Sequence, residues 1–435
     1  MPSAMLQSSE EQQPAARGRA AGRARSLVLA AMLALLAVAA AEGVAWVALW
    51  LMPNPADPHI RADSYPPEAP WVGELYRELK LSARLRWEPY VYWRRLPFAG
   101  QFVNVDGRGL RRTWQPPARS GGDPGPRPSS GATAGPPGGR RPRIFVLGGS
   151  DVWGTGVRDD HTLPSELARW LAAAGVEAEV VNYGETGYVS TQSVISLLRE
   201  LQRGNVPDVV VLYVGVNDAF SAFQSGAAGQ PQNETHRVAE FNLLRHTRRL
   251  MGETLRAVAA RSALVRLTRR LRGPAPASAA PIQAEAGDGL DRTETRGTIS
   301  PRLAGEVVHT LDVNAGAVQA LCAVHGCRAI ACWAPDLLDK LHRTPYEESR
   351  AALISAYAGA ILQVEDAVRR DWAGHASAAD RLFLGGLFAA TAAPRFIEAG
   401  HTSETANAEI AAAIGRHLLD HRLLPPPGPD TSPVE

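Results

Sequence analysis

The stretch Ile144–Ser150 (IFVLGGS) decides the fold, because four apolar residues run into two glycines and then a serine. The apolar run is typical of a buried strand, and the glycine pair predicts a tight junction before a helix. A serine at such a junction exposes its hydroxyl. Because that hydroxyl is a weak nucleophile at its own pKa, it needs a nearby base and a third group that orients the base. Ser150 is therefore a candidate nucleophile.

Two further blocks, far along the chain, supply the missing groups. Gly215–Asp218 (GVND) follows the apolar run 208–214, so Asn217 is expected at the carboxyl end of a strand, where parallel α/β sheets build their sites. Asp218 is a candidate cap for the helix that follows. The block Glu398–His401 (EAGH) contains a histidine that can act as a base and a carboxylate that can orient it.

The chain around these blocks alternates between strand patterns and helix patterns. Strands are expected at 143–147, 178–182, 208–214 and 328–333, and helices at 163–174, 190–203, 302–325, 346–370 and 402–419. A further late segment of the fold is expected at 381–384. This alternation predicts an α/β fold, a three-layer parallel sheet with helices on both faces. One transmembrane helix is expected to precede it.

The blocks resemble those of the SGNH (GDSL-type) hydrolase family, over roughly 143–420 with long unmatched insertions. Gly-Gly-Ser followed by Trp153-Gly154 is similar to a variant form of the family's first block, and Asn182–Tyr188 (NYGETGY) is similar to the second. The resemblance implies a flavodoxin-like fold and a membrane-anchored, extracytoplasmic member. It also implies an oxyanion hole made by the backbone N–H groups of Ser150 and Gly187 and the side-chain amide of Asn217.

Three positions depart from the family pattern. Glu398 stands where the last block has an aspartate, and its extra methylene could carry the carboxylate past the imidazole or demand another rotamer. Ser-His-Glu triads occur on other folds, so activity is the preferred interpretation. Asp151 would disfavour an oxyanion if it pointed inward, and we expect it to cap the next turn and face solvent. Asn407 matches a family Gly-Asn pair, but Ala406 replaces the glycine.

The amino terminus carries a membrane signal. Residues 27–52 are apolar except for Glu42, and they follow four basic residues, Arg17, Arg19, Arg23 and Arg25. This pattern predicts a single-pass signal anchor with its amino end in the cytoplasm and the catalytic domain outside. The alternative is a secreted protein cleaved near Ala39–Ala41, but apolarity continues through 44–51 and favours retention. Glu42 is either a protonated or partner-contacting group or a helix–helix contact.

The composition predicts six regions. They are a basic cytoplasmic tail (1–25), the anchor (26–52), a small membrane-proximal β region (60–114), a Pro/Gly-rich flexible linker (115–142), the catalytic domain (143–423) with an insertion at about 220–300, and a disordered tail (424–435). Aromatic residues of the membrane-proximal region are expected to pack in an interface. A basic helical stretch at 244–271 is expected to cover the site as an amphipathic segment, and the alternative is that its arginines meet anionic headgroups or an anionic substrate.

Other ligand classes are disfavoured. A net charge of +2 without interleaved aromatics argues against nucleic acid. No His or Cys cluster has metal spacing and no phosphate-binding glycine pattern occurs, so neither a metal nor a cofactor is expected. The three cysteines, Cys322, Cys327 and Cys332, are expected to be small buried apolar residues, with a Cys322–Cys327 bridge as the alternative.

These patterns predict a serine esterase or deacylase that acts through an acyl-serine, on an envelope glycan or a small acyl ester. The predicted catalytic residues are Ser150, His401 and Glu398. Two alternatives stay open: an extracytoplasmic O-acyltransferase for a glycan, and a catalytically silent protein of the same fold that binds or assembles glycans. The expected partners are the acylated substrate and the membrane, and the sequence names no protein partner.

Overall fold

The computed structural model describes residues 13–52, 69–116, 141–234, 237–238, 241, 251–252, 254–255, 259, 261–272, 298–373 and 379–425. The chain divides into two compact units. The first unit comprises Met1–Ala56 and Ala239–Pro281, and the second comprises Asp57–Val238 and Ile282–Glu435. Most of the predicted linker (115–142) and nearly all of the predicted tail (424–435) lie outside the described residues.

The second unit is built on the predicted parallel sheet. Its five strands are β5 (Arg143–Leu147), β6 (Glu179–Asn182), β7 (Val209–Val214), β8 (Arg328–Trp333) and β9 (Arg381–Phe383). They lie in the order β6-β5-β7-β8-β9, and every neighbouring pair is parallel. The chain starts at β5, moves outward to β6, and returns to β7 on the other side of β5. The strand order therefore reverses between β5 and β7, and ligands of open α/β sheets bind in the crevice at such a point.

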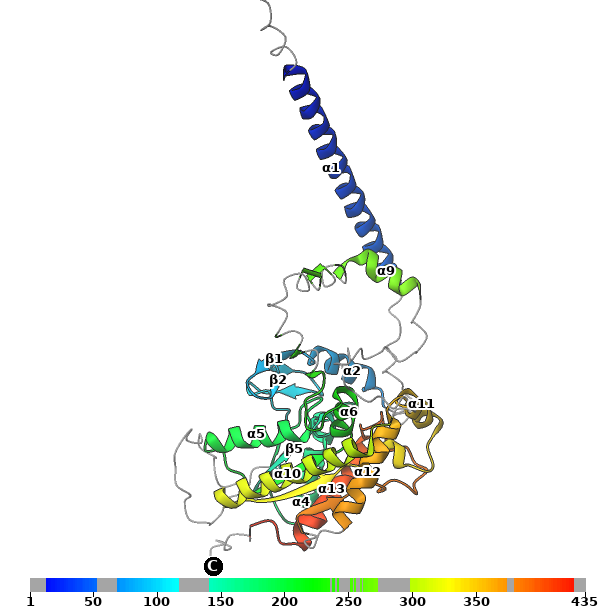
Figure 1. Ribbon diagram of the computed structural model, residues 1–435. Helices are drawn as coiled ribbons and strands as arrows, with labels where there is room; N and C mark the ends of the chain where they lie inside the picture. The colour runs from blue at the N-terminus through cyan, green and yellow to red at the C-terminus, as the bar shows by residue number, and fades with distance from the viewer. Residues whose placement is uncertain are drawn as a thin grey trace, which may run out of the picture. The chain divides into compact units, whose positions relative to one another are not determined.

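Helices cover both faces of this sheet, as predicted (Figure 1). Alternate residues of β5 point to opposite faces: Ile144 and Val146 pack in one apolar cluster, and Phe145 and Leu147 pack in the other. The first cluster includes residues of α4 (Leu163–Ala173) and α13 (Glu404–Asp420). The second includes residues of α5 (Ser190–Gln202), α10 (Pro301–His325) and α12 (Ala358–Ala373). Burial on both faces explains why the strand sequences are almost continuously apolar.

The helix expected at 346–370 is two helices, so that prediction is wrong. α11 (Pro345–Leu353) and α12 meet at an angle of 98°. The turn between them brings the ring of Tyr357 to 4.7 Å from the ring of Phe220 on α6 (Val216–Ser225) and 6.2 Å from that of Phe223. Neither proline nor glycine marks the break, so packing against α6 decides it.

The segment before the sheet contains two small antiparallel pairs and one helix that was not predicted. The elements are α2 (Val72–Leu81), β1 (Leu85–Glu88) with β2 (Tyr92–Arg95), and β3 (Phe98–Ala99) with β4 (Asn104–Val105). Trp93 Nε1 donates to the carbonyl oxygen of Thr186 at 2.9 Å, and the backbone N–H of Arg95 donates to Glu185 at 3.0 Å. β2 thus supports the loop that follows β6. The expectation that the aromatic residues of this region pack is confirmed for Trp93, whose ring lies 5.5 Å from that of Tyr188. It is wrong for Trp87 and Tyr90, which are 67% and 76% exposed.

The described part of the first unit is a long helix with a shorter one packed against it. In α1 (Gln13–Leu51), the stretch Val28–Leu51 has a mean hydropathy of 2.2 and is long and apolar enough to cross a membrane. α10 and the bent pair α11–α12 also pass this test of length and composition. Both belong to the second unit, however, and α10 buries its apolar residues in the core of the sheet.

Glu42 makes a helix–helix contact within the chain. Its carboxylate accepts hydrogen bonds from the backbone N–H groups of Ala263 (2.7 Å) and Leu264 (3.4 Å) and from the hydroxyl of Ser262. These donors lie at the start of α9 (Ala263–Leu271), where unpaired N–H groups favour a negative charge. The rest of the basic stretch at 244–271 is mostly undescribed, and its role as a cover over the site stays a prediction.

The three cysteines are free and buried. The expectation that they act as small apolar residues is confirmed, and the alternative bridge between Cys322 and Cys327 does not form.

Candidate active site

Ser150 lies at the carboxyl edge of the sheet, as the first residue of the short helix α3 (Ser150–Trp153). The two residues before Ser150 must be glycines, because neighbouring atoms leave no room for a side chain at either position. A Cβ atom at Gly148 would lie 2.6 Å from the carbonyl oxygen of Tyr213, and one at Gly149 would overlap the amide of Asn217. The glycine pair therefore lets the end of β5 approach the end of β7, and it leaves Ser150 8% exposed.

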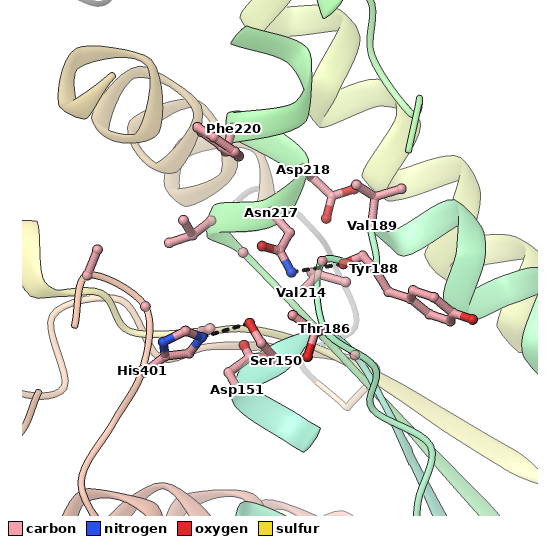
Figure 2. A pocket seen from close by; sticks show the side chains of 18 of the residues that line it. Ser150, Asp151, Thr186, Tyr188, Val189, Val214, Asn217, Asp218, Phe220 and His401 are labelled. Carbon is pink, nitrogen blue, oxygen red and sulfur yellow. Dashed lines mark hydrogen bonds between the residues drawn. The ribbon is translucent and has the colours of Figure 1, made fainter. Parts of the chain in front are cut away.

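Ser150, His401 and Glu398 form a continuous hydrogen-bonded chain. His401 Nε2 lies 2.8 Å from Ser150 Oγ (Figure 2). His401 Nδ1 lies 2.8 Å from Glu398 Oε2. The longer glutamate side chain thus reaches the imidazole, and it does so with one-third of its surface exposed (33%). The structure brings together all three residues that the sequence nominated as catalytic.

A tight loop fixes the imidazole. The backbone N–H of Ile397 donates to the carbonyl oxygen of His401 at 2.8 Å, and the Tyr346 hydroxyl donates to the carbonyl oxygen of Ile397 at 2.8 Å. Thr402 Oγ1 donates to Asn407 Oδ1 at 2.6 Å, and Asn407 Nδ2 donates to the carbonyl oxygen of His161 at 2.9 Å. The residue recognised from the family pattern, Asn407, therefore secures the chain that follows His401.

The three expected oxyanion donors line the same cavity as Ser150. Within the described part of the chain, the backbone N–H groups of Ser150 and Gly187 donate to no other residue. Gly187 has φ +76°, a left-handed conformation that favours glycine and orients this N–H. Asn217 donates to the carbonyl oxygen of Tyr188 at 3.0 Å (Figure 2). It accepts from Gln232 at 3.1 Å, so one of its amide hydrogens stays available.

Gln232 orients Asn217, and sequence analysis missed it. It lies in the insertion that no family block matches, so no local pattern marked it. Gln232 Nε2 donates to Asn217 Oδ1, and this bond determines which end of the amide is the donor.

Asp218 does not cap α6, so that expectation is wrong. α6 has no side-chain cap, and Asp218 is buried with its carboxylate turned toward the start of α5. There it accepts hydrogen bonds from the Ser190 backbone N–H (3.0 Å) and hydroxyl (2.6 Å). Burial raises the pKa of Asp218 to about 6. The residue ties α5 to α6 beside the cavity.

The expectation for Asp151 is half right. Its carboxylate does cap the turn, because it accepts a hydrogen bond from the Val152 backbone N–H at 2.8 Å. The side chain is only partly exposed, however, and it lines the cavity beside Ser150 (Figure 2). Burial raises the pKa of Asp151 to about 6 because the neighbouring structure excludes the water that would solvate its charge.

We expect Asp151→Asn to stabilise the protein at alkaline pH and not at acid pH. The carboxyl pKa is raised from 3.8 to about 6 on folding, so the folded state favours the protonated form. The contribution of this carboxyl group to the free energy of unfolding is fully present below about pH 4. It is lost as the pH rises through about 6. Asparagine still offers an oxygen that accepts the hydrogen bond from the Val152 N–H. The free energy of unfolding of Asp151→Asn at pH 8 should therefore exceed that of wild type by about 1–3 kcal/mol.

Urea unfolding of the full chain at pH 4 and pH 8 measures this difference. Asp366→Asn, on an exposed position of α12, is the matched control and should show no gain that depends on pH. Equal effects of Asp151→Asn at the two pH values would contradict the prediction.

The cavity between these residues has a volume of about 410 Å³. Its polar side carries the Ser150 hydroxyl, the His401 imidazole and the Asn217 amide. Apolar side chains from α6, α11, the turn after α11 and the loop after β8 line another part, namely Val216, Phe220, Leu353, Ile354, Tyr357, Ala334 and Pro335. A reactive hydroxyl therefore faces a partly apolar cavity of a size typical of small-molecule sites.

Comparisons with known proteins find solved structures of hydrolases whose sequences have low identity to this chain. No family model and no curated protein matches the chain. Solved structures that match include a lipolytic protein of the G-D-S-L family from Veillonella parvula DSM 2008, 13% identical, covering 64% of this chain and 96% of that chain with a TM-score of 0.31. A lipase/acylhydrolase from Enterococcus faecalis is 16% identical, covers 66% and 98%, and has a TM-score of 0.30. The SGNH-hydrolase family esterase AlinE4 is 13% identical, covers 65% and 97%, and has a TM-score of 0.28.

These matches are SGNH- and GDSL-type hydrolases, the family that the sequence blocks resemble. Sequence identities and TM-scores of this size do not assign a class to this chain. Its own residues define the class: an α/β protein with a parallel five-stranded sheet and a Ser-His-Glu chain at the carboxyl edge of that sheet.

Proposed function

We propose that the protein is a membrane-anchored serine hydrolase of the SGNH type, which cleaves ester bonds through an acyl-serine intermediate. The observation that carries the proposal is the hydrogen-bonded chain from the Ser150 hydroxyl through His401 to Glu398. This chain lies at the point of the sheet where the strand order reverses, beside two backbone N–H groups that donate to none of the described residues. An intact chain of this kind favours an enzyme over the catalytically silent alternative.

The first half of the reaction acylates Ser150. As Oγ attacks the ester carbonyl carbon, His401 Nε2 accepts the hydroxyl proton, and Glu398 accepts a hydrogen bond from Nδ1–H. The carboxylate thereby holds the tautomer in which Nε2 is free to act as the base. The tetrahedral intermediate then collapses, the imidazolium returns its proton to the leaving alcohol, and the acyl group stays on Oγ. In the second half, water repeats these steps and releases the acid.

The oxyanion formed in each half needs donors that are already in place. The Ser150 and Gly187 backbone N–H groups and the second amide hydrogen of Asn217 fill this role in the proposal. The contact between Gly149 and the Asn217 amide keeps that amide close to Ser150.

Asn217→Ala is expected to lower kcat about a hundredfold or more while KM changes little, because the oxyanion exists only along the reaction path. Steady-state hydrolysis of p-nitrophenyl acetate measures both constants. Gln224→Ala, on the same helix but outside the cavity lining, serves as the control. A loss confined to KM would contradict a role in oxyanion binding.

The substrate in this proposal is an acylated envelope glycan or a small acyl ester. The N-terminal span of α1 supports a protein held at the membrane, with its amino end in the cytoplasm and its catalytic unit outside. A cavity of about 410 Å³ with an apolar wall suits a small acyl group. An acyl-serine could also pass its acyl group to a sugar hydroxyl, so the test must include an acceptor.

The test uses the full chain in detergent micelles. We expect p-nitrophenol release from p-nitrophenyl acetate, and a fluorophosphonate should add its phosphonyl mass to the peptide that contains Ser150. An acetylated oligosaccharide formed in the presence of an acceptor would assign transfer in place of hydrolysis. An unlabelled Ser150 together with release no faster than in buffer would overturn the proposal.

A further inference from the structure

One buried arginine in the active-site cavity has no polar partner within the part of the chain that the structure describes. Arg350 lies on α11, is 8% exposed and lines the cavity that contains Ser150 and His401. Its Nε atom has no hydrogen-bond partner, and its guanidinium makes no hydrogen bond or ion pair with any described residue. The contact that it does make is with the ring of Tyr346, whose centroid lies 4.9 Å from Cζ.

This arrangement differs from that of Arg95 and Arg111, two other buried arginines of the same unit. Arg111 donates to Asp159 at 2.9 Å and to backbone carbonyl groups, and Arg95 pairs with Glu185 at 3.4 Å and donates to the carbonyl oxygen of Ser82 at 3.0 Å. A guanidinium stays charged in a protein, and burial of an unpaired charge is costly. Arg350 therefore holds a positive charge whose partner the described chain does not supply.

The carboxylates of the cavity are bonded to other groups. Asp151 accepts from the Val152 N–H, Asp218 from Ser190, and Glu398 lies against His401. None of them is hydrogen-bonded to Arg350. An anion that enters the cavity could thus pair with Arg350 without displacing one of these bonds.

Apolar residues beside Arg350 indicate how such an anion would be presented. Leu353 and Ile354 follow Arg350 by three and four positions, so they share its face around the end of α11, and both line the cavity. A ligand that contacts this wall would combine an apolar portion with a charged group. The planar fork of the guanidinium suits the two oxygens of a carboxylate.

We propose that Arg350 binds a negatively charged oxygen group of the substrate, a carboxylate in the simplest case, so that the preferred substrate is an anionic ester. The inference rests on the proposed ester hydrolysis and adds a substrate class to it. Arg350 then contributes substrate selectivity, and the Ser-His-Glu chain performs the same chemistry on charged and neutral esters.

The test compares matched charged and neutral esters with the full chain in detergent micelles. 4-Carboxyphenyl acetate against phenyl acetate places the charge on the alcohol part, and mono-4-nitrophenyl succinate against 4-nitrophenyl butyrate places it on the acyl part. Arg350→Met should lower kcat/KM about 10- to 100-fold for at least one charged ester and leave both neutral esters within about threefold. Arg350→Lys should restore part of the loss because it returns the charge without the fork.

Two controls separate the possible failures. Arg370→Met removes an exposed arginine of α12 and should affect no ester, so it accounts for the change in net charge. The inference is overturned if charged and neutral esters lose rate equally in Arg350→Met, or if neither charged ester responds. Failure of the proposed function itself has another signature: the neutral esters would be hydrolysed equally by wild type and Ser150→Ala.

Discussion

Ser150→Ala is expected to lower the hydrolysis of p-nitrophenyl acetate by about a thousandfold or more, to a rate close to that of the uncatalysed reaction. Alanine removes the oxygen that forms the acyl intermediate, and His401 then has no hydroxyl to deprotonate. The oxyanion donors would remain, so any residual rate reports their contribution alone.

The structure provides strict controls for this result. Ser193 lines the same cavity and is buried, and Ser193→Ala should keep activity within a few-fold of wild type because no hydrogen bond joins it to His401. His401→Ala should lose about as much as Ser150→Ala, and the double variant should lose little more, because the two side chains act as one unit. A Ser150→Ala variant that folds and keeps its turnover would eliminate the acyl-serine mechanism.

Glu398→Gln is expected to lower kcat by roughly a hundredfold to ten-thousandfold. A glutamine can turn its NH₂ group toward His401 Nδ1 and favour the tautomer that carries its hydrogen on Nε2. That tautomer cannot accept the Ser150 proton. The side chain of Glu398 is 33% exposed, so water can partly solvate the imidazolium, and we expect a loss toward the lower end of this range.

Glu398→Asp tests the length of the side chain separately from its charge. The 2.8 Å contact with Nδ1 depends on the additional methylene, so aspartate at this position should withdraw from the imidazole and cost activity. Glutamine would then be worse than aspartate, because it also changes the tautomer. If both variants stay within about threefold of wild type, Glu398 does not orient His401 during the reaction.

The sheet could be predicted from sequence because its signal is local. β5 and β8 have the predicted bounds, β6 and β7 differ from theirs by one residue at one end, and β9 lies within the late segment expected at 381–384. Strands buried on both faces must be apolar throughout, and the glycines and polar blocks at their carboxyl ends mark where each strand stops. Ser150 and Asn217 could be nominated for the same reason, since each stands in a short block beside such an end. His401 was nominated from the block that precedes α13.

Long-range packing determined what the sequence did not reveal. The 98° bend between α11 and α12 has no proline or glycine to mark it, and it places Arg350 and Tyr357 in the wall of the cavity. Gln232 lies in an unmatched insertion, yet it orients the Asn217 amide. Asp218 was assigned to its own helix, but it binds Ser190 at the start of α5.

The sequence by itself therefore determined the α/β class, the apolar N-terminal span and the candidate catalytic residues, because hydrophobic periodicity and short polar blocks act over neighbouring residues. Only the tertiary structure decided that Glu398 reaches His401, that Asp151 lines the cavity and that Arg350 is buried there without a polar partner among the described residues. Contact and burial depend on atoms from segments far apart in the chain, and residue order alone does not specify those distances.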